Sequence, residues 1–462
     1  MKKPLNALDR AFLGSESRDV MMHVGALMTF APPKKKKALD LIAELRDELA
    51  RTSEVQAPWN LKLQHPDLLK SPVQAWVTDD AFELDYHVRR SALPSPGDER
   101  ELGILVSRLH GTPLDFHRPP WECHFIEGLE RDRIAIYFKV HHSLIDGYTG
   151  MRMLVRSLSS EADELDAPMF WERPPVDGGG KKKNNEEHHA PTFETLVRAA
   201  REQAGVTKDV GRALMNVVRA VRHPERDLVA PLQAPKSILN QKITRSRRFA
   251  TQPIELERVK RVATKQGATV NDVILAICGT SLRRFLIEQD ALPEKPLVAM
   301  LPVNVRPKDD PGGSGNAVGA ILASLATDVA DIEERLIRIC ASTKKAKEQL
   351  SGMSKNAIMQ YSALVMAPLM LSVVPSAVAR VRPAFNVVVS NVPGPDTPLY
   401  LRGWRLDATY PLSIPFHGYA LNITVQSYAG TLGFGFTGCR DTLPHLQRLA
   451  VYAGESLDEL EG

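Results

Sequence analysis

The chain of 462 residues is short of cysteine and of net charge, and each shortage removes a class of protein from consideration. Its four cysteines are scattered without a Cys-x-x-Cys pair, which is typical of reduced thiols in a cytosol and not of a disulfide framework. A net charge of +4 does not favour a nucleic-acid partner, and neither a zinc-finger spacing nor a run of alternating aromatic and basic residues is present. We therefore expect a cytoplasmic protein that binds no nucleic acid.

The sequence also lacks a clear export or membrane-spanning segment. Its beginning, MKKPLNALDRAFLG, has no apolar core of the kind that a signal peptide needs, so secretion is not expected. The stretch between Asn356 and Arg380 carries no charge and is long enough to span a bilayer, but Pro368 and Pro375 interrupt it. Buried helices, a helix that lines an apolar cavity, or a helix on a membrane surface are the outcomes that we expect for this stretch.

The length of the chain predicts two domains, because a single hydrophobic core usually stops growing at about 250 to 300 residues. Hydrophobic residues make up 43% of the sequence and charged residues 25%, which is the composition of a globular protein. Residues 174–191 are polar and lack apolar periodicity, whereas residues 193–222 have the apolar spacing of a long helix. We expect an N-terminal domain at 1–173, a linker with a crossover helix at 174–240, and a C-terminal domain at 241–462.

Periodic apolar residues predict strands and helices in both halves of the chain, which indicates an α/β (α+β) fold. Alternation over residues 420–438 predicts a β-hairpin. The helix expected at 38–50 has an apolar face made of Leu39, Ile42, Leu45 and Leu49. Further helices are expected at 151–158 and 269–289, and strands at 23–30, 133–140, 296–307 and 385–395.

The stretch FKVHHSLIDGYTG joins an apolar strand to a helix and brings two histidines, an aspartate and a glycine together. Adjacent residues of an extended segment point to opposite faces, so His141 and His142 cannot both address one centre without a kink. This weakens a two-histidine metal site, since the histidines of a helical zinc pair lie one turn apart on one face. We therefore expect no metal here.

Two alternatives stay open for these residues. The first is structural, with His142 a satisfied core histidine and Asp146 the N-cap of a helix that begins near Tyr148. The second is catalytic, because mixed α/β folds commonly place their sites where strands end. A histidine there can take a proton from an alcohol when a carboxylate or carbonyl fixes its tautomer. Gly147 has no side chain, which would let a substrate approach this base.

Beyond this motif, longer parts of the sequence resemble a known family. HHSLIDG matches the HHxxxDG motif of the acyl-CoA-dependent acyltransferases related to chloramphenicol acetyltransferase and to nonribosomal-peptide condensation domains. One branch, the bacterial bifunctional wax ester synthase/acyl-CoA:diacylglycerol acyltransferase family, is similar to this chain over ordered blocks. Those blocks are PLNALDRAFLGSESRDVMMHVGAL, PLDFHRPPWE, APKSILNQKI, TVNDVILA, PVNVRP, GNAVG, SNVPGP and LNITVQSYAGTLGFG. The resemblance implies two chloramphenicol-acetyltransferase-like domains, each a mixed sheet with flanking helices, and an active site in a channel at their interface.

The resemblance also implies roles for single residues. His142 corresponds to the general base of the family motif, which would deprotonate the acceptor hydroxyl so that its oxygen attacks the acyl-CoA thioester directly, without an acyl-enzyme. Asp146 would orient the motif through an ion pair, with Arg306 as the candidate partner, and His141 would have a supporting role. Asn271 corresponds to a second active-site position, where its amide could hydrogen-bond the oxyanion or hold the substrate; a helix N-cap is the alternative.

Three other blocks carry weaker expectations. In PLDFHRPPWE we favour a structural role for Trp121 and its neighbours over a place in the channel wall. In SNVPGP we expect Asn391 to serve loop geometry and not chemistry. In MHVGAL, His23 belongs either to an acyl pocket or to the core.

The implied activity is acyl transfer from long-chain acyl-CoA to the hydroxyl of a fatty alcohol or of diacylglycerol. A thioester is already an activated acyl donor, so acyl-CoA is a substrate and no cofactor is expected. Lysine runs at 34–37 and 181–183 and the apolar tract 364–374 could hold the protein at an anionic membrane or droplet surface. Two rival interpretations are a condensation-domain-like acyltransferase that uses carrier-bound acyl groups and a non-catalytic lipid-binding paralogue. The resemblance assigns neither substrate-binding residues nor an oligomeric state.

Overall fold

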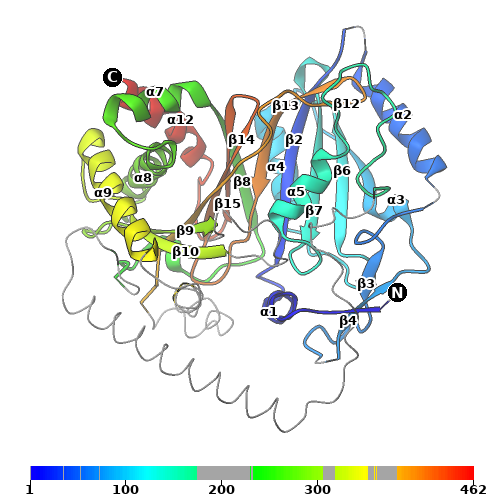
Figure 1. Cartoon of the computed structure of the whole chain (residues 1–462), viewed down its shortest axis with the longest axis horizontal. Helices are drawn as coiled ribbons and strands as arrows, with labels where there is room; N and C mark the ends of the chain where they lie inside the picture. Colours follow the sequence, from blue (N-terminus) through cyan, green and yellow to red (C-terminus); the bar gives the residue numbers. More distant parts are fainter. Residues whose placement is uncertain are drawn as a thin grey trace.

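The two halves of the chain form two sheet-and-helix units that lie side by side in the computed structural model (Figure 1). The residues that it describes are 2–34, 36–52, 54–71, 73–173, 229, 233–304, 318–351, 358, 361 and 382–462. The helix expected at 193–222, most of the expected linker, Arg306, Lys35, the lysine run 181–183 and most of the stretch 356–380 lie outside these ranges.

Six strands of the described residues form the N-terminal sheet: β2 His23–Ala31, β5 Val88–Ala92, β6 Trp121–Glu127, β7 Ile134–His141, β12 Tyr400–Leu401 and β13 Trp404–Leu412. Their order across the sheet is β12-β13-β2-β7-β6-β5. Strand β5 runs parallel to β6, and the other neighbours are antiparallel. The strands expected at 23–30 and 133–140 are confirmed as β2 and β7.

The C-terminal sheet contains, among the described residues, β8 Arg247–Glu255, β9 Val298–Asn304, β10 Val318–Ser324, β11 Val387–Val392, β14 Leu421–Tyr428 and β15 Thr431–Cys439. Their order is β10-β9-β11-β14-β15-β8, and β11 runs parallel to both of its neighbours. The expected hairpin is confirmed as β14 and β15, and the strands expected at 296–307 and 385–395 as β9 and β11. A small sheet near the N-terminus joins β1 Lys2–Pro4, β4 Ala75–Thr78 and β3 Leu61–Leu63.

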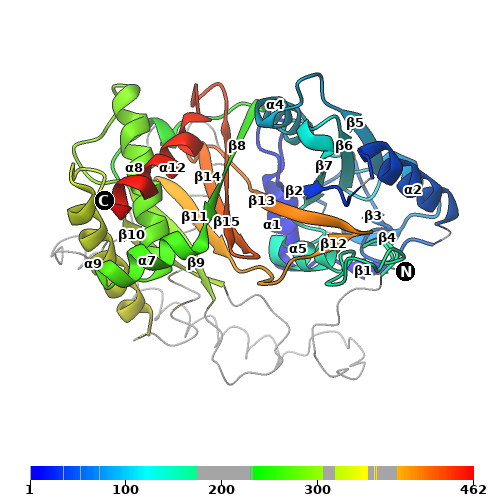
Figure 2. The same ribbon diagram turned by 90° about the horizontal axis from the view of Figure 1, so that it is seen from above.

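Helices cover the outer side of the C-terminal sheet, whereas α4 of the N-terminal half lies between the two halves and packs against Phe249 of β8. Helices α7, α8, α9 and α12 lie on the side of the C-terminal sheet that faces away from the N-terminal sheet (Figure 2). The bounds of the described α-helices are α1 Ala7–Ser15, α2 Ala38–Arg51, α3 Leu84–His87, α4 Glu99–His110, α5 Gly147–Val155, α7 Leu256–Gln266, α8 Val270–Glu288, α9 Ile332–Ser351 and α12 Arg448–Glu461. The helices expected at 38–50, 151–158 and 269–289 are thus confirmed as α2, α5 and α8.

The apolar face predicted for α2 is wrong at one position. Leu39 is 62% exposed, whereas Leu41, Ile42 and Leu45 are buried. The buried stripe therefore follows residues 38, 41, 42 and 45, which is the spacing of one helical face. Leu39 lies three residues before Ile42, a spacing that fits a helical face, but it falls just outside the buried stripe.

One segment from the C-terminal half crosses into the N-terminal sheet. Strand β13 pairs with β2, so that Leu412 lies opposite Gly25. Strand β15 of the C-terminal sheet approaches β13 through two glycines: a Cβ on Gly433 or Gly435 would lie about 2 Å from a carbonyl oxygen of β13. No side chain fits at these two positions, so the glycines of LGFGF let the backbone of β15 approach the backbone of β13. The alternating phenylalanines point the other way, into the C-terminal core.

The segment between α1 and β2 lies where the two cores meet. Val20 and Met22 belong to the apolar cluster of the C-terminal half, and Phe12 of α1 packs against that cluster. Met22 is followed directly by β2, the strand next to β7. The end of β7, which carries the two histidines, therefore lies at the junction of the two halves.

Candidate active site

The His-His motif occupies the transition from β7 to α5, as the sequence predicts. Strand β7 ends at His141, which pairs with His23 on β2, and α5 begins at Gly147. The Asp146 carboxylate accepts hydrogen bonds from the amide of Thr149 at 2.9 Å and from its hydroxyl at 2.7 Å. The prediction that Asp146 is a helix N-cap is thus confirmed. Its expected ion pair with Arg306 involves a residue outside the described ranges.

His141 is fixed through both of its ring nitrogens. It is only 1% exposed, and Nε2 lies 3.3 Å from a carboxylate oxygen of Glu16. The hydroxyl and the amide of Ser143 lie 2.6 and 3.2 Å from Nδ1, so this nitrogen accepts while Nε2 donates. The same Glu16 oxygen accepts a hydrogen bond from the amide of Met22 at 2.5 Å. An imidazole held in this way has no nitrogen left for a substrate, which supports the supporting role expected for His141.

Glu16 was missed by sequence reasoning. It lies in the resembling block PLNALDRAFLGSESRDVMMHVGAL, but no pattern of spacing links it to a histidine more than a hundred residues later. Only the fold brings its carboxylate to His141 and to the start of β2.

His142 is placed very differently from its neighbour. Its amide donates to the carbonyl of Met22 at 2.8 Å, and its ring stacks on Phe12 with centroids 4.1 Å apart. The Nδ1 atom is buried and has no hydrogen-bond partner among the described residues. Burial lowers the pKa of His142, an effect that the charge of Asp146 and the histidine's own carbonyl oppose. The imidazole is therefore neutral at pH 7 and can accept a proton.

The surroundings of Gly147 are open. No atom lies within 4 Å of the position that a Cβ would occupy on this residue. Glycine is therefore not required here by crowding within the described part of the chain, and the expectation that it leaves room for a substrate stays a prediction.

Asn271 lies at the start of α8, and the helix-cap alternative for it is wrong. The N-cap is Thr269, whose side chain accepts from the amide of Asp272 while Asp272 accepts from Thr269 in return. Asn271 is exposed, and its Oδ1 accepts a hydrogen bond from Nδ2 of Asn391 at 2.7 Å. Asn391 belongs to β11 and not to a loop, so the expectation of loop geometry misses its pairing with Asn271. No hydrogen bond within the described ranges joins Asn271 to His142.

Trp121 and His23, from two further blocks, have structural surroundings. Trp121 is fully buried, and its Nε1 donates to the carbonyl of Trp59 at 2.7 Å. His23 is also buried, and its Nε2 lies 2.8 Å from the carbonyl of His110, which places it in the core. Among the described residues no three His, Cys, Asp or Glu side chains are grouped so that they could hold a metal ion.

A buried ion pair fixes the chain behind the histidines. Lys139, two residues before His141, is fully buried, and its Nζ lies 3.1 Å from Glu122. The same ammonium donates to the carbonyls of Leu109 and Thr112 at 3.1 and 2.9 Å. Burial alone would raise the pKa of Glu122, but the hydrogen bond from His124 and the charge of Lys139 lower it to about 2. The Glu122 carboxylate is therefore charged, whereas burial lowers the pKa of Lys139 and the charge of Glu122 opposes that shift. The bonds of Lys139 tie β7 to the end of α4.

Two family models cover most of the chain. The wax ester synthase/diacylglycerol acyltransferase catalytic domain matches residues 5–274, and the C-terminal domain of the same family matches residues 314–461. The chain belongs to the wax ester synthase/diacylglycerol acyltransferase family. The catalytic-domain match includes both the His-His motif and Asn271.

Relatives with the same coverage agree with this assignment. A Mycobacterium tuberculosis protein named as a candidate diacylglycerol O-acyltransferase is 53% identical, over 99% of this chain and 96% of that protein. The O-acyltransferase WSD of Acinetobacter baylyi is 38% identical, over 100% of this chain and 97% of that protein. The protein is therefore an acyltransferase of the wax ester synthase/diacylglycerol acyltransferase family.

Solved structures support the fold. The wax ester synthase/diacylglycerol acyltransferase from Marinobacter aquaeolei superposes with a TM-score of 0.79 at 40% identity, covering 99% of this chain and 98% of that one. The first condensation domain of the calcium-dependent antibiotic synthetase shares the fold at a TM-score of 0.55 and 16% identity, covering 100% and 95% of the two chains. The expected pair of chloramphenicol-acetyltransferase-like domains is thus confirmed. Within the described ranges, no helix has the length and apolar character needed to cross a membrane.

Proposed function

We propose that this enzyme transfers the acyl group of a long-chain acyl-CoA to the hydroxyl of a fatty alcohol or of diacylglycerol, with His142 as general base. The observation that carries the proposal is the contrast between the two histidines. His141 is engaged at both nitrogens, whereas His142 is a neutral imidazole with a lowered pKa and no side-chain hydrogen bond from the described residues. A base in this state is suited to take a proton from an alcohol near neutral pH.

In the proposed reaction the His142 imidazole removes the hydroxyl proton as the alcohol oxygen attacks the thioester carbonyl carbon. The carbonyl electrons move to its oxygen and form a tetrahedral oxyanion. Collapse of this oxyanion breaks the carbon–sulfur bond, and the CoA sulfur takes the proton from His142. The products are an ester and free CoA, so the reaction needs no cofactor and no acyl-enzyme. Glu16 and Ser143 hold His141, and Asp146 starts α5, so that the turn between them carries His142 in one orientation.

The start of α8 is suited to stabilise the developing oxyanion. A helix of this length directs the partial positive charge of its dipole to its first turn, where Asn271 lies. The Oδ1 atom of Asn271 accepts from Asn391, whereas its Nδ2 makes no hydrogen bond within the described part of the chain. We propose that this Nδ2 donates to the oxyanion or to the bound thioester carbonyl.

Substitution of Asn271 by alanine is expected to lower kcat about 100-fold, since loss of one oxyanion donor has an effect of that order. The matched control is Asn391→Ala, which removes only the partner of Asn271 and should lower kcat by about fivefold or less. Steady-state rates of CoA release measure both. Equal losses in the two variants would assign the pair a structural role and would contradict the oxyanion donor.

Acyl and alcohol chains are expected to bind mainly through apolar contact. Each buried methylene contributes about 0.8 kcal/mol, so a long chain can dominate binding. The same physics discriminates poorly, by roughly 1 to 3 kcal/mol for each methylene, so broad use of chain lengths follows. Contact with a membrane or droplet surface, from which such substrates enter, is part of this proposal.

The function is tested by product identification. Purified protein with palmitoyl-CoA is expected to form palmityl palmitate from hexadecanol and triacylglycerol from diolein, with one CoA released for each ester. Mass spectrometry identifies the esters, and a thiol reagent measures CoA. A third arm supplies the palmitoyl group on a carrier protein. Ester from that donor alone would favour the condensation-domain-like alternative, and no ester from any donor would favour the non-catalytic one.

A further inference from the structure

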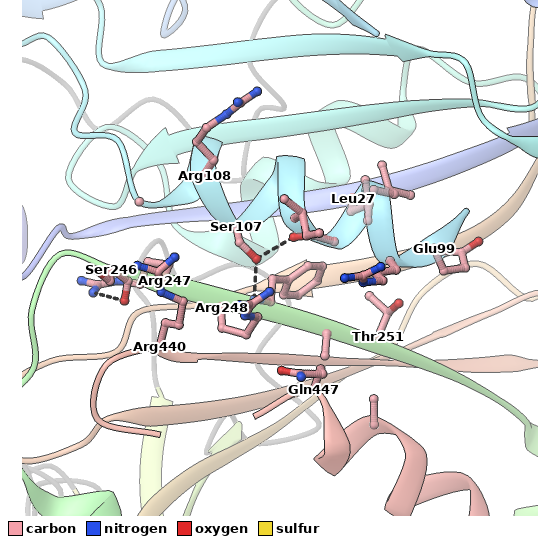
Figure 3. A pocket seen from close by; sticks show the side chains of 18 of the residues that line it. Leu27, Glu99, Ser107, Arg108, Ser246, Arg247, Arg248, Thr251, Arg440 and Gln447 are labelled. Carbon is pink, nitrogen blue, oxygen red and sulfur yellow. Dashed lines mark hydrogen bonds between the residues drawn. The ribbon is translucent and has the colours of Figure 1, made fainter. Parts of the chain in front are cut away.

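A cleft of about 1040 Å³ opens between the two halves of the molecule, apart from the histidines (Figure 3). Helix α4 forms its N-terminal side, and β8 with the start of α12 forms its C-terminal side. The hydroxyl of Ser107 on α4 accepts from the amide of Phe249 on β8 at 2.9 Å, which joins the two sides at the base. The cleft has the size of small-molecule sites in proteins.

The described lining of the cleft is strongly basic. Arginine side chains line it at positions 100, 108, 245, 247, 248 and 440, against a single carboxylate, that of Glu99. Glu99 is already paired with Arg133 at 3.0 Å. Arg440 has only a long contact, 3.6 Å, with Asp441, which also accepts from Thr244. Arg100, Arg108, Arg245 and Arg248 make no ion pair with any described carboxylate, so the cleft holds positive charge that the protein itself does not neutralise.

The charges are crowded as well as unpaired. Burial and then the nearby charges of Arg440 and Arg100 lower the pKa of Arg248. Figure 3 shows Arg248 and Arg440 on the same side of the cleft, below α4 in that view. Like charges held together cost stability unless an anion is bound among them. A bound polyanion would remove this cost.

The cleft lies directly behind the His-His motif. Arg247 in its wall donates to the carbonyl of Asp19, three residues after Glu16, which contacts His141. On the other side, the carbonyl of Thr112 in the lining accepts from Lys139, two residues before His141 on β7. A ligand in the cleft therefore lies next to the two segments that lead to Glu16 and to His141.

We propose that this cleft binds the nucleotide of acyl-CoA, with Arg100, Arg248 and Arg440 around its phosphates. The proposal rests on the function proposed above and names the donor-side site of that reaction. Guanidinium groups bind phosphate oxygens with paired, charge-assisted hydrogen bonds. Ile104 of α4 and Val451 of α12, 42% and 55% exposed, line the same cleft from its two sides and offer apolar surface to the adenine ring. The pantetheine arm would then lead the thioester inward to His142.

The shape of the site favours a nucleotide over the head groups of a membrane. A membrane surface binds basic side chains that project from a flat or convex face. Here the arginines line a hollow between two units of the fold, and apolar side chains from both units line it as well. A small polyanion with a planar ring satisfies both features.

The proposal is tested with the double variant Arg248→Ala/Arg440→Ala. Its dissociation constants for CoA and for adenosine 3′,5′-bisphosphate, from calorimetry on the full chain, are expected to rise about tenfold or more, since two charge-assisted contacts are lost. The ratio of kcat/KM for palmitoyl-CoA to kcat/KM for palmitoyl-pantetheine, which lacks the nucleotide, is expected to fall by a similar factor. The matched control Arg46→Ala/Arg51→Ala removes two exposed charges from α2 and should change each value by less than about twofold.

Three outcomes decide between sources of phosphate and between proposals. CoA affinity equal to that of the parent would overturn the cleft proposal, even if esters still form. Weaker flotation on phosphatidylglycerol vesicles with unchanged CoA affinity would overturn it in favour of a lipid-surface contact. If the parent protein forms no ester with either acceptor but binds CoA, and the double variant binds CoA more weakly, the cleft proposal stands and the proposed function is contradicted. The two results are separable because calorimetry does not require turnover.

Discussion

Substitution of His142 by alanine is expected to lower kcat for ester formation by about 10³-fold, within the range that a positioned general base supplies. The ring of His142 packs on Phe12 and makes no side-chain hydrogen bond within the described residues, so its loss should remove the base while leaving the fold largely intact. Rates of CoA release with palmitoyl-CoA and hexadecanol measure the effect.

The control for this variant is His117→Ala, which removes an exposed histidine whose ring nitrogens lie 3.2 Å from Asp67 and from Asp115. It should retain the parent rate. Calorimetry of CoA binding to the His142→Ala protein tests whether the donor site is intact, and an affinity equal to that of the parent is expected. A His142→Ala enzyme that releases CoA at the parent rate would remove His142 as the base.

The pH profile of the parent enzyme gives an independent check on the same residue. The pKa of His142 is lowered below 6.5, chiefly by burial, so the neutral base is present above that lowered pKa. The value of kcat/KM should therefore stay level from pH 8 down to about 6.5 and fall only as the pH drops through the lowered pKa. An acid limb centred above 6.5 would contradict this assignment.

Substitution of Lys139 by methionine is expected to lower the free energy of unfolding by about 3 kcal/mol, which is the order of magnitude for removal of one partner of a buried ion pair. The change leaves the Glu122 carboxylate buried without its ammonium, although His124 and Arg89 remain beside it. It also removes the Lys139 donor from the carbonyls of Leu109 and Thr112, of which Leu109 keeps the amide of Thr112. Urea unfolding at pH 7 measures the effect.

Two further variants separate burial from charge. The double variant Lys139→Met/Glu122→Gln should recover part of the lost stability, because it removes the charge that the single variant leaves alone. Lys260→Met breaks an ion pair of similar length, 2.6 Å to Glu257, in which both side chains are exposed (49% and 60%), and should cost at most about 1 kcal/mol. A Lys139→Met protein as stable as the Lys260→Met protein would show that the buried pair does not hold β7.

Local patterns in the sequence were sufficient for most of the elements and for the strand-to-helix turn that carries the two histidines. The apolar runs 23–30 and 133–140 became neighbouring strands, and the alternation at 420–438 became a hairpin, because side-chain periodicity is a property of the strand itself. The separate roles expected for His141 and His142 have the same basis: adjacent residues at a strand end face opposite ways. The Asp146 cap could be predicted because an N-cap depends on residues within one turn.

Errors arose where a short pattern fits more than one geometry. Leu39 has a spacing compatible with the apolar face of α2 but lies one step outside the buried stripe. Asn271 can cap a helix by residue type, yet the reciprocal bonds of Thr269 and Asp272 set the helix start two residues earlier. For Leu39 the packing of the whole helix decides, whereas Asn271 loses the cap to a neighbouring threonine that forms reciprocal bonds with Asp272.

The sequence by itself determined the two mixed sheets, the strand-to-helix turn with its two unlike histidines, and the family to which the chain belongs. Tertiary structure alone decided that β13 enters the N-terminal sheet, that Glu16 reaches His141, that Asn391 pairs with Asn271, and that arginines from α4 and β8 share one cleft. The physical reason is the range of the forces. Periodicity and capping act within one element, whereas these contacts join residues that only long-range packing brings together.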